Sequence, residues 1–287
     1  MDERRTIDTS VGRLSVRVTG EGAPTLLWHS LFVDDRSWDR LVPLLDRGRQ
    51  LITVNGPGHG SGDAASGDPG RRYSNDGCAA AAGTLLDELS VHQPVEWVGN
   101  AWGGHVGTLA ASRTPHLIRS LVMLGSPIAA LTRAERARTL LLLALFRVGG
   151  PSRVVIDGAT KVLLSPRTRD TDPDAVHLVA DSFRRADRRR LTNAIVSVSL
   201  RRAGLADELR RITQPTLIVT GAAHHGFTPE QATAAAALVR HGEVAVVPDA
   251  AYLLPLEAPE ATAELINRFW AAHAETASKA ADTPKSW

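Results

Sequence analysis

Residues 97–106, Trp-Val-Gly-Asn-Ala-Trp-Gly-Gly-His-Val, have the composition and spacing of a sharp turn between a strand and a helix. Gly99 and Gly103 each lie two residues from a central position, which is the spacing of G-x-S-x-G, where the turn projects a nucleophilic serine. The central residue here is Ala101, which has no nucleophilic atom. Hydrolysis through an acyl-enzyme needs an oxygen or sulfur nucleophile beside a base. The stretch therefore predicts the sharp turn but not this hydrolysis.

Four further landmarks occur in order along the chain. They are His29-Ser30-Leu31, Trp38, the glycine-rich residues 55–60 in which Asn55 replaces an acid, and Leu256-Glu-Ala-Pro259. Together with the turn around Ala101, they resemble the α/β-hydrolase superfamily over residues 14–272. The resemblance implies a mostly parallel, twisted sheet flanked by helices, with a helical cap inserted after the predicted strand 121–124.

The resemblance also implies where a catalytic triad would stand, and all three positions carry other residues. Ala101 occupies the position of the nucleophile. His224 stands three residues after Gly221, where the acid is expected, and Tyr252 stands where the Glu-x-Pro that follows it places the catalytic histidine. An ordinary serine esterase, lipase or peptidase is therefore not expected.

Two backbone N–H groups implied by the resemblance do not depend on these substitutions. The amides of Trp102 and of a residue near Leu31 would form an oxyanion hole. A site that polarises a carbonyl in this way suits isomerisation, cyclisation, dehydration or retro-aldol cleavage. Tyr252 could act there as a hydrogen-bond donor or general acid, and His224 as a base or as a partner of Tyr252.

Three other residues are candidates for the same pocket, each with a structural alternative. Ser30 could add a hydroxyl, or it could be a small residue tolerated in a turn. Asp34 could reach the pocket, or it could cap a helix. Trp38 could line an aromatic wall, or it could pack in the core.

Short apolar runs alternate with helical patterns along the chain, as in βαβ units with a parallel sheet. The predicted strands are residues 13–18, 25–28, 51–54, 95–98, 121–124, 216–220 and 244–247. This pattern assigns residues 1–127 and 210–274 to an α/β core, 128–209 to a helical cap, and 275–287 to a flexible tail.

The predicted cap is rich in arginine. Its arginines include Arg133, Arg136, Arg138, Arg147, Arg153, Arg184, Arg185, Arg188, Arg189 and Arg190. They could form a solvated charged face, or they could line an entrance that selects anionic substrates.

Composition excludes several other classes of function. A net charge of +2 gives no reason to expect nucleic acid as a partner, and one cysteine rules out a disulfide framework. No nucleotide-binding glycine motif and no metal-ligand spacing occurs, so we expect no cofactor and no metal. We also expect no membrane span, no signal peptide and a cytoplasmic location, and the sequence leaves the oligomeric state open.

Three functions therefore remain. The favoured one is a cofactor-independent, non-hydrolytic enzyme of the isomerase, cyclase or lyase type, which acts on a small organic carbonyl substrate in specialised metabolism. The second is a catalytically inactive protein that binds a small molecule. The third is a hydrolase in which His224 activates water directly.

Overall fold

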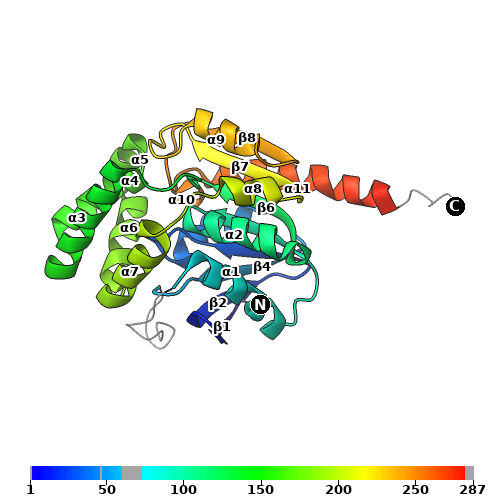
Figure 1. Cartoon of the computed structure of the whole chain (residues 1–287), viewed down its shortest axis with the longest axis horizontal. Helices are drawn as coiled ribbons and strands as arrows, with labels where there is room; N and C mark the ends of the chain where they lie inside the picture. Colours follow the sequence, from blue (N-terminus) through cyan, green and yellow to red (C-terminus); the bar gives the residue numbers. More distant parts are fainter. Residues whose placement is uncertain (1, 46, 60–72, 282–287) are drawn as a thin grey trace.

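The computed structural model describes residues 2–45, 47–59 and 73–281. In this part of the chain an eight-stranded sheet carries helices on both faces, and a group of helices stands to one side of it (Figure 1). The predicted fold class, a mostly parallel sheet flanked by helices, is confirmed. The glycine-rich residues 55–60 are described as far as His59, and Gly60 lies outside the described residues.

The strand order is β1-β2-β4-β3-β5-β6-β7-β8. The strands are β1 (Asp2–Thr9), β2 (Gly12–Thr19), β3 (Ala23–Trp28), β4 (Arg49–Asn55), β5 (Val95–Asn100), β6 (Ile118–Leu124), β7 (Thr216–Gly221) and β8 (Gly242–Val247). The first two are antiparallel to their neighbours, and the other six run parallel. Strands β5 and β7 are buried along their whole length, which explains their continuous apolar runs.

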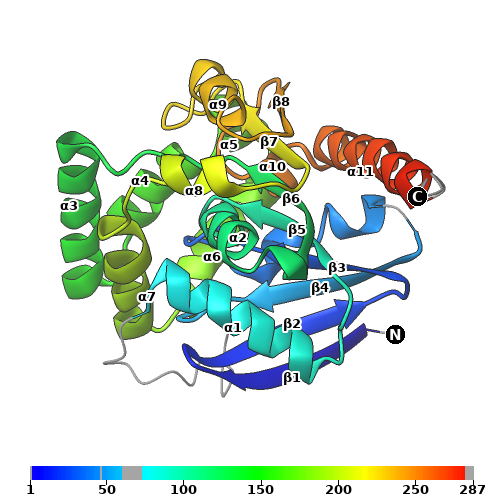
Figure 2. The same cartoon turned by 45° about the vertical axis from the view of Figure 1, so that its right-hand side comes forward.

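Helices cover the two faces of the sheet and enclose two separate cores. One face carries α1 (Asn75–Glu88), α2 (Trp102–Arg113), α8 (Ala206–Arg211) and α9 (Pro229–Ala236), and the other carries the 3-10 helices η1 (Asp35–Trp38) and η2 (Val42–Leu44) with α11 (Pro259–Ala281). Two short helices, η4 (Pro115–Leu117) and α10 (Leu254–Glu257), complete the core. Figure 2 shows α1 and α2 across the first face. In β3, Leu26 and Trp28 pack into one core and Leu27 into the other, as strand alternation requires.

The segment between β6 and β7 is a layer of helices beside the carboxyl ends of the strands. It contains α3 (Arg133–Gly149), α4 (Arg153–Leu163), α5 (Pro166–Thr171), α6 (Pro173–Arg185), α7 (Arg188–Ala194) and the π-helix η5 (Ile195–Leu200). All of residues 128–209 are described, and none is in a strand. Arg36 in η1 binds Asp181 at 2.5 Å, and Arg40 binds Asp172, so ion pairs join this layer to the core.

The end of the chain differs from the sequence-based expectation. Residues 275–287 were expected to form a flexible tail, but α11 continues to Ala281. The alanine-rich composition of this stretch favours a helix even without apolar periodicity, because alanine has the highest helix propensity. Residues 282–287 lie outside the described part of the chain.

The turn between β5 and α2 has no room for side chains at its glycines. A Cβ atom on Gly99 would lie 2.1 Å from the carbonyl carbon of Gly103, and one on Gly103 would lie 1.9 Å from the carbonyl oxygen of Trp28. Both contacts are with backbone, which cannot rotate away. The close approach of α2 to β3 and β5 therefore depends on glycine at both positions.

We expect Gly103→Ala to lower the free energy of unfolding by about 2–4 kcal/mol, because β3 and α2 must separate to admit the methyl group. Gly149→Ala is the matched control, since a Cβ atom there meets nothing within 4 Å, and its effect should stay below about 1 kcal/mol. Urea denaturation of both variants measures the difference. Equal stability of the two variants would contradict the packing described for this turn.

Candidate functional site

Ala101 stands at the sharp turn that the sequence predicts. Its backbone angles are φ 49° and ψ −100°, and it caps the N-terminus of α2. Its amide donates to the carbonyl of Leu124 at 2.8 Å, which ties the turn to the end of β6. Such a conformation costs a non-glycine residue about 1–3 kcal/mol and persists only where the surrounding structure enforces it. The side chain at this point is fully buried and carries no reactive atom.

Two backbone amides beside Ala101 are free to bind an anion. Trp102 is the first residue of α2, and Leu31 lies in the loop after β3. Neither amide donates a hydrogen bond within the described residues, and both residues line the same cavity. The start of α2 adds the positive end of a helix dipole. These two amides are therefore suited to stabilise negative charge on an oxygen.

The loop that carries Leu31 is held by two buried histidines. His29 Nε2 accepts the Gly56 amide at 3.0 Å, and His59 Nε2 donates to the Leu31 carbonyl at 2.6 Å. Burial lowers the pKa of both imidazoles, that of His29 to about 3. Both rings are therefore neutral at neutral pH, and their role is to position the loop.

Tyr252 lies on the loop after β8, and the backbone of this loop is fixed from two sides. Asn100, the residue before Ala101, donates from Nδ2 to the Tyr252 carbonyl at 2.9 Å. Glu257 Oε1 accepts the amides on either side of Tyr252 at 3.0 and 3.1 Å. The other oxygen of Glu257 accepts the Ser165 amide of the cap at 2.7 Å. The resemblance supplied Glu257 only as a spacing mark, whereas the structure shows it positioning the tyrosine.

The Tyr252 phenol is protonated at neutral pH. Burial raises its pKa, and this effect exceeds the opposing influence of the nearby Ser30 hydroxyl and Arg202 guanidinium. The Ser30 hydroxyl is buried, and no atom of the described structure lies at a distance and angle suited to a hydrogen bond with it. The phenol and the serine hydroxyl thus lie beside each other close to the cavity that Tyr252 lines.

His224 lies next to Tyr252, with the centres of the two rings 5.0 Å apart. Its Nδ1 accepts the Gly226 amide at 3.1 Å, so the proton of the neutral ring is assigned to Nε2. Burial lowers the pKa of His224 to about 4. With one nitrogen engaged and the other protonated, His224 offers a hydrogen-bond donor rather than a free base.

The segments that carry Ala101, His224 and Tyr252 meet at the carboxyl ends of β5, β7 and β8, below the cap. A cavity of about 440 Å³ opens there, and His224 and Tyr252 line it together with Leu31 and Trp102. Its apolar lining includes Phe32, Leu142, Leu143, Phe146, Val155 and Phe183. The volume lies within the range of about 300–1,000 Å³ that small-molecule sites occupy.

Sequence reasoning did not single out Arg202, a polar residue of this cavity that follows η5. Its Nη1 lies 3.1 Å from His105 Nε2 and also donates to the Pro127 carbonyl. Nothing in the sequence distinguishes Arg202 from the many other arginines near it, because only the folded chain brings it beside residues 105 and 127. His105, a residue of α2, is buried and also lines the cavity.

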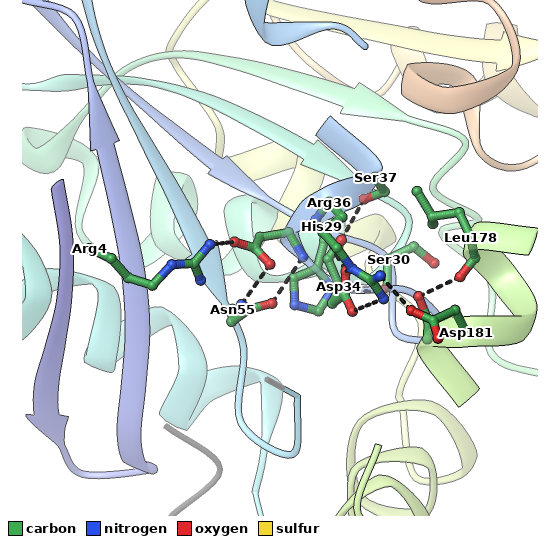
Figure 3. Close-up of polar contacts among 11 residues, drawn as sticks. Arg4, His29, Ser30, Asp34, Arg36, Ser37, Asn55, Leu178 and Asp181 are labelled. Carbon is green, nitrogen blue, oxygen red and sulfur yellow. Dashed lines mark hydrogen bonds and ion pairs between the residues drawn. The ribbon is translucent and has the colours of Figure 1, made fainter. Parts of the chain in front are cut away.

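Two predicted pocket residues lie elsewhere. Asp34 caps η1 and is paired with Arg36, which also reaches Asp181 of the cap (Figure 3). These contacts use its carboxylate, and it does not line the large cavity. Trp38 is buried in the core on the opposite face of the sheet, because η1 packs there. For both residues the structural alternative is the one observed.

Neither a metal centre nor a membrane span is evident in the part of the chain that the structure describes. Its residues contain no group of three or more His, Cys, Asp or Glu side chains arranged to hold a metal ion. None of its helices combines the length and the apolar character needed to cross a bilayer.

Two kinds of sequence comparison match this chain. A family model described as alpha/beta hydrolase fold matches residues 25–149. The 2-(acetamidomethylene)succinate hydrolase of Mesorhizobium japonicum is 28% identical over 280 residues, which cover 92% of this chain and 94% of that protein. The 2-hydroxy-6-oxo-2,4-heptadienoate hydrolase of Pseudomonas putida is 29% identical over 119 residues, or 42% of this chain and 39% of the relative. Two further curated relatives are likewise matched over only 38–39% of their length.

Solved structures match the whole fold. A thermophilic esterase from Thermogutta terrifontis superposes with a TM-score of 0.82 at 20% identity, covering 94% of this chain and 99% of the esterase. The enol-lactonase from Burkholderia xenovorans LB400 gives a TM-score of 0.81 at 19% identity, covering 93% and 100%. Identities this low establish the fold and leave the reaction open. Family model, strand order and structural neighbours agree that the chain has the alpha/beta hydrolase fold.

Proposed function

We propose that this protein is an enzyme of the isomerase, cyclase or lyase type, which acts on a small organic carbonyl compound without forming an acyl-enzyme. The observation that carries the proposal is Ala101 at the sharp turn, beside the free amides of Leu31 and Trp102 and within the neighbourhood of a buried phenol. The turn offers no nucleophile, and the two amides and the phenol are suited to stabilise charge.

In the proposed reaction, the two amides stabilise negative charge as it develops on the carbonyl oxygen. Fixed donors in a water-poor site are effective because they need no reorganisation when the charge appears. The charge arises as the bond between Cα and the carboxylate of a 3-oxo acid breaks, so that carbon dioxide leaves and the electron pair of the bond becomes an enolate. Tyr252 then transfers its phenolic proton to the enolate carbon, and solvent returns a proton to the phenolate. The raised pKa of Tyr252 keeps the proton on the phenol until that step.

Binding without turnover is the second candidate, and one observation favours it. His224 is engaged at Nδ1 by Gly226, so this ring offers no free base beside Tyr252. The same observation weighs against a hydrolase in which His224 activates water. The curated relatives are named as hydrolases of small organic compounds. Their names support a small-molecule ligand, and they also support hydrolysis as the reaction that competes with the proposed one.

A panel assay separates the three candidates. The protein is incubated in D₂O with 3-oxo acids, their esters and simple ketones, and ¹H NMR follows α-proton exchange and carbon–carbon cleavage. Hydrolysis of p-nitrophenyl butyrate is measured in parallel. The proposal expects exchange or cleavage with at least one compound and little ester hydrolysis. An ester turnover rate typical of esterases would contradict it, and tight binding without reaction would favour the second candidate.

The Tyr252→Phe variant tests the proton donor. General acid catalysis contributes about 10²–10⁴-fold, so the rate on the reacting compound should fall by about that factor. Thermal stability should change little, because the substitution keeps the shape of the ring. Tyr73→Phe is the matched control, since it removes the hydroxyl of a buried tyrosine outside the cavity and should leave the rate unchanged. Unchanged turnover in Tyr252→Phe would remove the phenol from the reaction.

Ala101→Ser tests whether adding a nucleophile alone is enough to give ester hydrolysis. We expect no esterase activity above background, because a hydroxyl without a neighbouring imidazole base stays protonated. The triple variant Ala101→Ser, His224→Asp, Tyr252→His should hydrolyse p-nitrophenyl butyrate about 10²-fold faster than the single variant. The rings of His224 and Tyr252 are in contact, so an aspartate and a histidine at these two positions would lie close enough to interact. Strong esterase activity in Ala101→Ser alone would contradict this assignment.

A further inference from the structure

Arg202 is a half-buried cation that forms no ion pair within the described residues, and the Glu135 carboxylate acts on it only from a distance. Its Nη1 contacts only the Pro127 carbonyl and His105 Nε2. Burial holds the pKa of His105 well below its usual value, so this ring is uncharged at neutral pH. The arginine therefore makes only neutral hydrogen bonds, unlike Arg36 and Arg40, which each bind a carboxylate.

A buried charge without a counter-ion is unfavourable, because the protein replaces only part of the hydration that the ion loses. Guanidinium groups in such positions are suited to bind carboxylate or phosphate oxygens, which they contact through two parallel N–H donors. Arg202 lies on the cavity wall, so an anion in the cavity can reach it without entering the protein core.

The other charged side chains of the cavity wall favour an anion as well. Arg138 and Lys161 add two positive charges, and among the described residues Glu135 is the one carboxylate that lines this cavity. Glu135 is engaged as part of the capping box of α3, where it accepts the Thr132 amide at 2.8 Å. The wall is thus net cationic, and its carboxylate is already hydrogen-bonded.

We propose that Arg202 binds the carboxylate of a small organic acid whose apolar body lies against the cap. The apolar walls formed by Leu142, Leu143 and Phe146 suit a hydrocarbon chain or ring. With its carboxylate on Arg202, such a ligand is anchored beside Tyr252, whose phenol is close enough to Arg202 to interact electrostatically. This inference names the substrate class and rests on the proposed use of the cavity for a small molecule.

A purely structural role for Arg202 must be separated from ligand binding. The two chain segments that link the cap to the core meet here, since the Leu205 amide donates to the Ile128 carbonyl at 2.9 Å. The bond from Arg202 to Pro127 joins the same two segments. Arg136 is the matched control, because it also donates to a backbone carbonyl, that of Leu200, but does not line the cavity.

The experiment compares acids with their neutral analogues. Hexanoate, octanoate and 4-phenylbutanoate are titrated by calorimetry at pH 7.5 against the full chain, alongside their primary amides, which have nearly the same shape. A charge-assisted contact should make at least one acid bind about ten- to a hundredfold tighter than its amide. Arg202→Gln should reduce that ratio to about one without weakening amide binding, and Arg136→Gln should keep it.

The proposal is overturned if the unmodified protein binds no acid more tightly than its amide, or if Arg202→Gln keeps the preference. If Arg202→Gln fails to fold, Arg202→Lys replaces it. That variant keeps the charge but loses the planar fork, so acid binding should weaken severalfold while amide binding stays constant, and unchanged acid binding overturns the proposal. An acid preference without any turnover would refute only the proposed enzymatic function, whereas turnover of neutral compounds without acid preference would refute only this inference.

Discussion

The positive φ of Ala101 is the constraint on which the site depends. A sharp change of direction between β5 and α2 is possible only because Gly99 and Gly103 let the backbones touch. That turn sets where α2 begins and therefore where the Trp102 amide lies. The same packing places Asn100 where its side chain binds the carbonyl of Tyr252. Elements that are distant in sequence are thus aligned by one enforced backbone conformation.

Most of the fold could be predicted because the central strands are buried on both faces and therefore appear as apolar runs. The predicted strands 95–98 and 216–220 match β5 and β7 closely for this reason. Strand β1, with the sequence DERRTIDT, was missed because it lies at the edge of the sheet and has no apolar pattern. Its pairing with β2 forms it, and pairing is invisible in the composition of a single segment.

Less of the candidate site could be predicted, for a related physical reason. The motif spacing that resembles the α/β-hydrolase superfamily was enough to predict Tyr252 and His224 near each other, because such spacing reflects the topology of the whole sheet. It could not show that Gly226 engages His224 at Nδ1, which changes that ring from a possible base into a donor. Nor could it single out Arg202, because burial of an arginine depends on which distant segments cover it.

Four polar groups around the cavity share one chemical character, which bears on the role of a strained turn without a nucleophile. The free amides of Leu31 and Trp102, the Tyr252 phenol and the Arg202 guanidinium are all hydrogen-bond donors. Alanine at this turn places no side-chain hydroxyl beside the amides, while the turn still presents its own amide. A conformation that costs about 1–3 kcal/mol then places donors where, in the proposed function, they would stabilise an oxygen anion.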